Sequence, residues 1–486
     1  MHVTLPAVPA SPVLIGIDAG PNGVRVAAVD PDGRVLASTS RSPAPDDPDA
    51  IWLAVVAGLD ELRLGRGHEP AAVGLAADRD TVVAWDRRTG DAFHPAVPGT
   101  DRRTAARCDR LEAGGHQPQV RETTGLVLDP TFAATRMAWL LAEGGVRAGP
   151  GLALGTLDAF LLWRLTDGAA FATDHSVASR TMLYDIRYGV WSTELCDLFG
   201  VPKAALPELG PTTGRLGTTA GGVPVSALVG DEPATLFAQG CIRPGMAKTT
   251  YGRGSVVLRN AGDRCPVPAD GLLTTVAWSL AGARPTFAYE GSIAATGAAL
   301  DWLRDGLGVV RSAGEAAALA GSLRDAQGVA FVPAFSGLGS PWWDPRARGA
   351  IVGLTRGSGR AQLARAAVEA MAYQTRDVVD AMTAAAGPPL TELRVDGESA
   401  ALDLLLQIQA DQIRAAVARA APRPTAAVGA ALLAGLAEGV WSSVEEVAAL
   451  WPAEATFEPR APQSVVDDRH ATWLRAVGRA RRWSAS

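Results

Sequence analysis

The sequence predicts an α/β protein made of two related lobes, and three observations lead to this expectation. Apolar strand patterns alternate with helical patterns along most of the chain, which is typical of α/β folds. A strand, a glycine-bearing turn and a second strand occur at 13–29, and a similar arrangement recurs at 247–258. Residues 207–224 are rich in proline, glycine and threonine, which favours a boundary between lobes. We therefore expect an N-terminal lobe at 1–222 and a C-terminal lobe at 223–486.

The first half of the chain shows alternating strand and helix signals. Asp32-Gly33 is a turn signal inside the opening strand meander, and Asp167-Gly168 ends a helical pattern. Period-2 or short apolar runs predict strands at 13–20, 24–29, 34–38, 71–76, 81–85 and 151–155. Helical periodicity predicts helices at 48–64, 101–113, 132–142, 157–165 and 191–199.

The second half opens with a strand whose apolar residues alternate from Val223 to Val229 and which ends at Gly230-Asp231. Pro233 is a helix-start signal, and Gly240 ends that short helix. Further predicted strands are at 247–258, around a Tyr-Gly-Arg-Gly turn, and at 329–333 and 393–397. Predicted helical segments are at 291–304, 360–382, 401–410 and 425–439, whereas 337–349 is expected to be irregular and the tail from residue 460 to be polar and rich in arginine.

Composition excludes several classes of function. The 486 residues are 48% hydrophobic and 20% charged, as in an ordinary globular protein, and a net charge of -6 argues against nucleic acid as the main partner. No apolar run approaches the length of a membrane span and there is no leader-like segment, so we expect a cytoplasmic protein that binds no membrane. The four cysteines and six histidines are scattered, which argues against a disulfide framework or a zinc site. Lysine occurs only at Lys203 and Lys248, so no phosphate-binding loop of the G-x-x-x-x-G-K-[ST] type exists.

Two carboxylates follow the ends of predicted strands. Asp18 closes the first strand, and Asp231 closes the strand that begins at Val223. The carboxyl ends of strands are where open α/β sheets bind ligands, so both are candidates for a functional site. For each, the simpler interpretation is an aspartate in a turn or at the start of a helix.

Longer motifs resemble those of one family of enzymes. The matching segments are TLDAFLLWRLTDG (156–168), ASRTMLYDIR (178–187), ELCDLFGVP (194–202), GMAKTTYGRGS (245–255), VPAFSGLGSPWWDPRARGAIVGLTRG (332–357) and YQTRDVV (373–379). In content and order they resemble the FGGY carbohydrate kinases, most closely the glycerol kinase branch. This resemblance implies two actin-like lobes of the ribonuclease H type around a central cleft. It also implies ATP and Mg²⁺ as cofactors, a small polyol or sugar as substrate, and a homodimer or homotetramer.

The resemblance assigns roles to individual residues. Asp231 is the expected general base, because a sugar hydroxyl needs a carboxylate to accept its proton. Asp18 and Asp231 together are the expected Mg²⁺ site. The residues expected to bind the acceptor are Arg79, Asp80, Thr131, Asp231 and Glu232. Those expected at the nucleotide are Gly20, Asn22, Gly23, Arg25, Gly252, Arg253, Gly254, Gly297, Asp301, Gly397 and Glu398.

Several motif positions depart from the family pattern. The first phosphate loop reads Asp-Ala-Gly-Pro-Asn-Gly at 18–23, without the family's hydroxyl side chains, and Arg253 replaces a threonine in the second. On the acceptor side, Asp80 replaces a glutamate and Thr131 a tyrosine. Each lost hydrogen bond to a charged phosphate costs about 1.5–3 kcal/mol unless it is compensated. A pseudokinase that binds a metabolite is therefore an alternative hypothesis, and an ATPase of the actin or Hsp70 type without an acceptor is a third.

Overall fold

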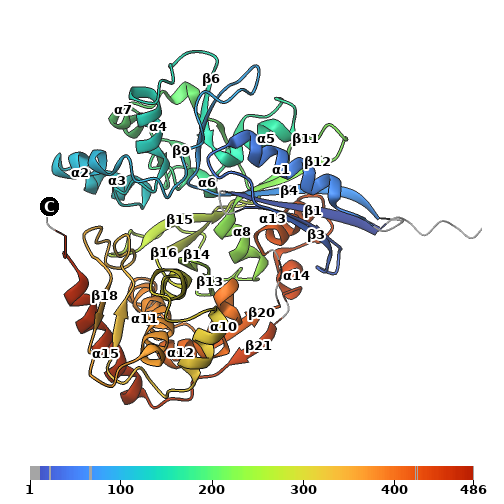
Figure 1. The fold of residues 1–486 in the computed structure, drawn as a ribbon. Helices are drawn as coiled ribbons and strands as arrows, with labels where there is room; N and C mark the ends of the chain where they lie inside the picture. The colour runs from blue at the N-terminus through green and yellow to red at the C-terminus, as the bar shows by residue number, and fades with distance from the viewer. Residues whose placement is uncertain are drawn as a thin grey trace, which may run out of the picture.

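The protein, seen in a computed structural model that describes residues 11–20, 23–64, 68–421, 423, 425–451 and 453–484, has two lobes. Each lobe is built on one large mixed sheet, and helices cover the sheet faces (Figure 1). This arrangement confirms the expected α/β class with two lobes. Among the described residues, no helix combines the length and the apolar character needed to cross a membrane.

The sheet of the first lobe has six strands in the order β11-β12-β4-β1-β2-β3. Its strands are β1 (Ser11–Gly20), β2 (Gly23–Val29), β3 (Val35–Arg41), β4 (His68–Ala77), β11 (Thr213–Thr218) and β12 (Pro224–Gly230). β4 lies parallel to both β1 and β12, with Asp18 beside Ala76 and Gly230 beside Ala77. The carboxyl ends of these three strands therefore meet at one edge, where Asp18, Asp78 and Asp231 follow one another across the sheet.

The sheet of the second lobe has seven strands in the order β15-β16-β14-β13-β19-β20-β21. Its strands are β13 (Ala247–Tyr251), β14 (Ser255–Gly262), β15 (Leu273–Trp278), β16 (Thr286–Ile293), β19 (Glu392–Asp396), β20 (Ala416–Ala420) and β21 (Ala453–Phe457). From β16 to β21, the parallel and antiparallel pairings repeat those from β3 to β11 of the first sheet. The repeated turn motif seen in the sequence thus belongs to a repeated sheet.

The strand after Val223 lies in the first sheet. β12 pairs in parallel with β4 over Val225–Gly230, and β11 pairs with β12 on its other side. The sequence analysis assigned this strand to the second lobe, because the loop before it looked like a linker. Its hydrogen bonds show instead that β12 is a strand of the first sheet. We therefore propose that the lobe boundary lies at 239–246, between the helix after β12 and the start of β13.

Two helices lie between the sheets (Figure 1): α8 (Asp231–Ala238) and α13 (Thr425–Ala437). α13 comes from the C-terminal part of the chain but packs on β1 and β4 of the first sheet. A Cβ at Gly16 would lie 1.8 Å from the Ala427 carbonyl oxygen, and a Cβ at Gly74 would lie 2.0 Å from that of Ala430. α13 also crosses α8, where a Cβ at Gly429 would lie 2.1 Å from the Ala234 carbonyl oxygen. Only glycine permits backbones to approach this closely.

The remaining elements form the outer layers of the two lobes. The first lobe adds α1 (Pro48–Glu61), β5 (Val82–Asp86), α2 (Ala105–Ala113), α3 (Gln117–Thr124), α4 (Ala133–Ala142), β6 (Leu152–Thr156), α5 (Leu157–Leu165), β7 (Ala172–Asp174), α6 (His175–Ala178), β8 (Tyr184–Asp185), β9 (Val190–Trp191), α7 (Thr193–Phe199) and β10 (Glu208–Gly210). The second lobe adds α9 (Gly297–Asp301), α10 (Ala313–Gly321), β17 (Ala330–Val332), β18 (Ala350–Val352), α11 (Arg360–Ala386), α12 (Asp403–Ile413), α14 (Val444–Ala449) and α15 (Gln463–Ala480).

One sequence-based expectation for the second lobe was wrong. The segment 291–304 was expected to be one helix, but it contains the end of β16, α9 and the start of a π-helical turn at Trp302–Gly306. The tail is polar and rich in arginine as expected, and it also contains a helix that was not predicted, α15, whose Trp473 and Val477 are buried. Polar residues outnumber this narrow apolar face, which is why the helix was missed.

Candidate active site

A cleft of about 990 Å³ lies where strand ends of the two sheets face each other. The first sheet contributes the ends of β1, β4 and β12, with Asp18, Asp78 and Asp231. The second sheet contributes Thr250 on β13, the turn between β13 and β14, and Asp396 at the end of β19. The register explains this second group, because Thr250 lies beside Asp396 in the parallel pair β13–β19. The volume of the cleft is in the range of cavities that bind small molecules.

Asp18 and Asp231 line this same cleft. Burial raises the pKa of Asp18 to about 6; Arg25, 3.6 Å away, opposes this shift, whereas Glu232 and Asp78 add to it. Burial also raises the pKa of Asp231 well above its ordinary value, against the effect of Arg79 and with the help of Glu232, Asp78 and Asp18. So many carboxylates in one buried place favour either a bound proton or a bound cation.

The acidic groups also decide what kind of metal site fits here. Among the described residues, no three His, Cys, Asp or Glu side chains are grouped closely enough to hold a metal ion by themselves. Mg²⁺ is usually bound by one or two carboxylates together with waters and substrate phosphates. Asp18 and Asp231 fit such a partial site, in which a nucleotide supplies the remaining oxygens.

Behind Asp231 runs a chain of charged side chains. Arg79 Nε donates to Asp231 Oδ1 at 3.2 Å, and Arg79 Nη1 donates to Glu290 Oε2 at 2.8 Å. Arg180 donates to the other oxygen of Glu290 at 2.7 Å and to Asp80 Oδ2 at 3.1 Å. The candidate base and the candidate acceptor residue Asp80 are therefore linked through three charged side chains.

A buried arginine also holds the backbone around the expected acceptor site. Arg136 is fully buried and donates to the carbonyl oxygens of Pro98, Asp80 and Thr131. A Cβ at Gly99 would lie 2.6 Å from the Cβ of Asp80, so the absence of a side chain there lets Asp80 occupy its position. Arg136 thus fixes three loops of the first lobe to one another.

Glu232 has a different partner from the one that the sequence predicts. It lines the cleft beside Asp231, but its carboxylate accepts a hydrogen bond from the buried Lys248. Lys248 also donates to Thr250 Oγ1 at 3.0 Å, and Thr250 Oγ1 donates to Asp396 Oδ1 at 2.7 Å. This chain of bonds joins α8 of the first lobe to β13 and β19 of the second. Glu232 is therefore engaged between the lobes, and its predicted contact with an acceptor stays a prediction.

Glycines bring the nucleotide-side turns of the second lobe close together. Gly252, Arg253 and Gly254 line the cleft in the turn between β13 and β14. A Cβ at Gly397, whose φ is +93°, would lie 2.6 Å from the Tyr251 carbonyl oxygen. A Cβ at Gly297 would lie 2.7 Å from the Gly252 carbonyl oxygen. The turn is thus packed against two other glycine-bearing segments, backbone against backbone, and its shape depends on all three.

The predicted site residues divide into three groups according to where they lie relative to the cleft. Those that line the cleft are Asp18, Gly20, Gly23, Arg25, Asp231, Glu232, Gly252, Arg253, Gly254, Gly397 and Glu398. Those outside its lining are Arg79, Asp80 and Thr131 on the Asp231 side, Gly297 behind the turn, and Asp301, which pairs with Arg304 at 3.1 Å. Asn22 lies outside the described residues.

Sequence reasoning missed several residues that this geometry brings to the site. They are Asp78 at the end of β4, Lys248 and Thr250 on β13, Glu290 on β16 and Arg180 after α6. One signal was available, since Glu290 is the one charged residue of the strand Thr286–Ile293 and such residues are rarely buried without a partner. Its partners are more than 100 positions away in the sequence, and no local pattern identifies them.

Two family models match the chain, one on each side of the proposed lobe boundary. The N-terminal domain of the FGGY family of carbohydrate kinases matches residues 13–238, and the C-terminal domain matches residues 247–438. The chain belongs to the FGGY family of carbohydrate kinases. The family resemblance read from the motifs is therefore confirmed, and so is the expectation that the chain is a carbohydrate kinase.

Individual relatives of this FGGY kinase agree with the family assignment. It is 44% identical to a glycerol kinase of Gloeobacter violaceus, with 97% of this chain and 98% of that protein covered. It is also 44% identical to a glycerol kinase of Trichlorobacter lovleyi, with 97% and 99% covered. The crystal structure of Plasmodium falciparum glycerol kinase with ADP superposes with a TM-score of 0.87 at 26% identity, covering 97% of this chain and 98% of that one. A xylulose kinase from Lactobacillus acidophilus, with a TM-score of 0.84 at 17% identity and 96% and 97% covered, shares the fold.

Proposed function

We propose that this FGGY kinase transfers the γ-phosphoryl group of ATP to a hydroxyl of a small polyol, with Mg²⁺ as the metal. The observation that carries the proposal is that Asp18 and Asp231, which come from two different strand ends, line one cleft together with the glycine-bearing turn 252–254. The identity to glycerol kinases over nearly the whole chain supports a polyol as the acceptor class.

In this mechanism Asp231 accepts the proton of the attacking hydroxyl. Its position at the start of α8 and its bond from Arg79 hold the carboxylate at the edge of the cleft. A general base works best when its pKa is close to the working pH, and burial raises the pKa of Asp231 in that direction. When bound, Mg²⁺ neutralises charge on the phosphates and on the phosphoryl group in transfer, and Asp18 and Asp231 are the residues that would hold it.

The phosphates are expected to lie at the glycine turns. Gly20, Gly23, Gly252 and Gly254 all line the cleft, and backbone N–H groups in such turns bind anions. Arg25 and Arg253 line the same space and offer charge-assisted hydrogen bonds in place of the hydroxyl groups that the family motifs usually carry. Binding and alignment of the phosphates, more than covalent chemistry by the protein, accelerate this reaction.

The acceptor is expected to bind between Asp231, Asp80 and Thr131. Among the described residues, Asp80 Oδ1 is buried and has no hydrogen-bond partner, so a substrate hydroxyl would satisfy it. Arg180 fixes the other oxygen of Asp80, and Arg136 fixes the carbonyl oxygens of Asp80 and Thr131. With a threonine at 131 and a glycine at 99, neither position supplies an aromatic wall, which favours a screen over several polyols rather than glycerol alone.

A coupled assay of ADP release tests the proposal, with glycerol, erythritol and pentuloses as acceptors in the presence of Mg-ATP. We expect turnover with at least one of them and a loss of about 10²–10⁴-fold in kcat for Asp231→Asn, because the substrate proton then has no base. Asp468→Asn, an equal change at an exposed position of α15, should leave turnover as it is. Turnover that is insensitive to Asp231→Asn would rule out the mechanism.

One feature of the cleft bears on how tightly the nucleotide binds. Glu398 lines the cleft next to Gly397, where a carboxylate repels a nearby phosphate. Calorimetric titration with Mg-ATP measures the affinity, and an absence of binding would contradict the proposed phosphoryl transfer.

We also propose that the kinase is cytoplasmic and forms a homodimer or homotetramer. This assembly is what the resemblance to the glycerol kinase branch implies. Light scattering on the purified protein measures the oligomeric state directly, and a monomer at working concentration would contradict it.

A further inference from the structure

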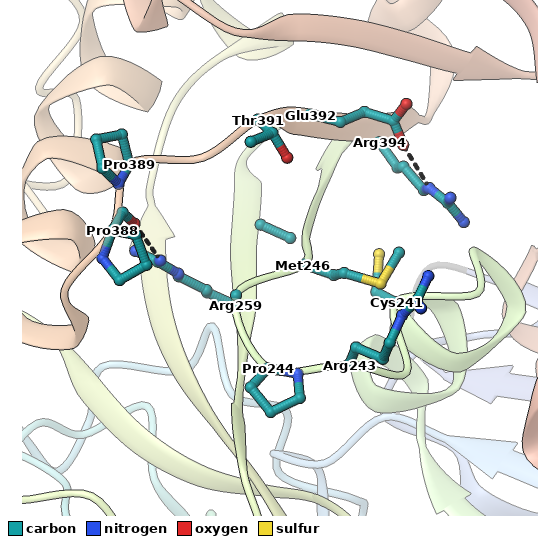
Figure 2. A pocket seen from close by; sticks show the side chains of 12 residues that line it. Cys241, Arg243, Pro244, Met246, Arg259, Pro388, Pro389, Thr391, Glu392 and Arg394 are labelled. Carbon is teal, nitrogen blue, oxygen red and sulfur yellow. Dashed lines mark hydrogen bonds and ion pairs between the residues drawn. The ribbon is translucent and has the colours of Figure 1, made fainter.

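We propose that a second cavity, on the second lobe, binds a small molecule that carries a phosphate monoester. This cavity has a volume of about 480 Å³ and lies at the start of β13 and β19 (Figure 2). Both strands run from here to the nucleotide-side cleft, since Ala247 lies beside Leu393 at this end and Thr250 lies beside Asp396 at the other. The cavity is therefore separate from the site proposed for catalysis.

Three arginines border this cavity, and two of them have no acidic partner among the described residues. Arg259 on β14 is 1% exposed, and its guanidinium donates only to neutral carbonyl oxygens, those of Met382 at 3.1 Å and Pro388 at 2.6 Å. Arg243 lies in the loop before β13, and within the described part of the chain its side chain makes no hydrogen bond or ion pair. A buried guanidinium without a counter-ion is costly, and a bound anion lowers that cost.

The third arginine completes a charged wall. Arg394 on β19 pairs with Glu392 at 2.8 Å and lies over the Trp451 ring, with 4.0 Å from Cζ to the ring centroid. Figure 2 shows Arg243 and Arg394 on one side of the cavity and Arg259 on the other, reaching toward Pro388. Against three guanidinium groups the lining offers one carboxylate, so the cavity has an excess of positive charge.

The shape and the other walls favour a phosphate ester over other anions. Donors from different sides suit a tetrahedral dianion whose oxygens point in several directions, whereas a carboxylate is planar and pairs with one guanidinium fork. Pro244, Pro388, Pro389 and Met246 add apolar surface beside the charged wall. The space far exceeds what a single water-sized ion fills, which leaves room for the carbon part of an ester.

Calorimetric titration of the full chain with methyl phosphate tests this site, with malonate as the dicarboxylate probe. We expect methyl phosphate to bind more tightly than malonate, and we expect its affinity to fall as salt is added. Arg243→Gln, at an exposed position, should lower the affinity for methyl phosphate at least tenfold, because a charge-assisted bond to phosphate is lost. Glu392→Gln should raise the affinity, because the one acidic group of the lining is removed.

The matched control is Arg356→Gln, which removes an exposed arginine that lines neither cavity. It should change the affinity for methyl phosphate less than twofold. Three results would overturn the proposal: unchanged binding in Arg243→Gln, loss of binding in Arg356→Gln, or malonate binding as tightly as methyl phosphate. The circular dichroism spectrum of each variant establishes that it is folded.

Discussion

The carboxylate of Glu290 is fully buried between two guanidinium groups. Burial alone would raise its pKa, but Arg180 and Arg79 outweigh burial and hold the pKa at about 2. The side chain is therefore ionised at neutral pH. Glu290 holds Arg79, which is the partner of Asp231. It also holds Arg180, which is the partner of Asp80.

Glu290→Gln should destabilise the protein by about 3–5 kcal/mol, because two buried guanidinium groups lose their shared counter-charge. The midpoint of thermal unfolding is the measurement. The control is Glu122→Gln, the same change in an exposed ion pair with Arg187 at 3.5 Å, where we expect a change below about 1 kcal/mol. Equal midpoints for the two variants would contradict a structural role for the Glu290 charge.

Asp158, at the start of α5, gives a pH-dependent contribution to stability. Burial raises its pKa from 3.8 to about 6, although the hydroxyls of Thr156 and Thr173 donate to it, and nearby Asp174 adds to the shift. The folded state then binds more protons than the unfolded state between pH 4 and pH 6. Stability from this group is present below pH 4 and is lost as pH rises through 6, by about 3 kcal/mol in total.

Asp158→Asn should remove this dependence, because an amide does not titrate. Thermal midpoints of the variant and the parent, measured from pH 4 to pH 7, should differ by an amount that changes with pH in favour of the variant at the higher end. A constant difference over this range would show that Asp158 does not titrate in the folded protein.

Among the predicted site residues, those that line the cleft are marked by a local motif. Asp18, Asp231 and the turn 252–254 could be found because strand ends and glycine turns leave a pattern in the sequence. Glu290 and Arg180 could not, because their importance comes from contacts between segments that are distant along the chain.

At the scale of elements, the turn between β13 and β14 depends on glycines in two other segments. Gly397→Ala would place a Cβ against the backbone of Tyr251, at 2.6 Å from its carbonyl oxygen and 2.7 Å from its carbonyl carbon. We expect this change to displace the turn and to raise KM for ATP about tenfold or more, because the turn lines the cleft. Initial rates at varied ATP concentration measure the effect.

Gly282→Ala separates this contact from backbone strain. Gly282 also has a positive φ, +76°, but a Cβ there would have nothing within 4 Å. Both substitutions carry the strain of a left-handed backbone, about 1–2 kcal/mol, so both should lower the thermal midpoint. Only Gly397→Ala should change KM, and an equal KM in both variants would argue against the packing argument.

Elements with strong periodicity were predicted closely, and those with weak periodicity were not. α5 spans Leu157–Leu165, the range that the sequence predicts, because its apolar residues are bounded by clear turn signals. β20 was missed because Ala416–Ala420 is short and rich in alanine, and β21 was missed because Ala453–Phe457 is a short strand at the edge of the sheet. β12 was found, but its lobe was not, because sheet membership is decided by pairing partners.

At the scale of the whole molecule, α8 and α13 cross where the two lobes meet. Gly429→Ala would place a Cβ 2.1 Å from the Ala234 carbonyl oxygen, which forces the two helices apart. Because α8 begins with Asp231 and α13 packs on the first sheet, we expect a loss of both thermal stability and kcat.

Gly478→Ala is the matched control for that prediction. Gly478 is exposed in α15, and a Cβ there would have nothing within 4 Å. Alanine is the better helix former, so this variant should be as stable as the parent or more stable by about 0.5–1 kcal/mol. If both alanine variants behaved alike, the close crossing of α8 and α13 would not matter for activity.

The position of α13 has a consequence for how the protein is made. Leu14, Ala72, Ala76 and Val229 of the first sheet share one apolar cluster with α13, which the ribosome produces long after that sheet. Until Ala437 has emerged, this face of the N-terminal sheet has no permanent cover and remains exposed to other chains. A polypeptide cut after residue 238 would keep that apolar face in water. We therefore expect nascent chains of this kinase to be prone to aggregation until synthesis is nearly complete.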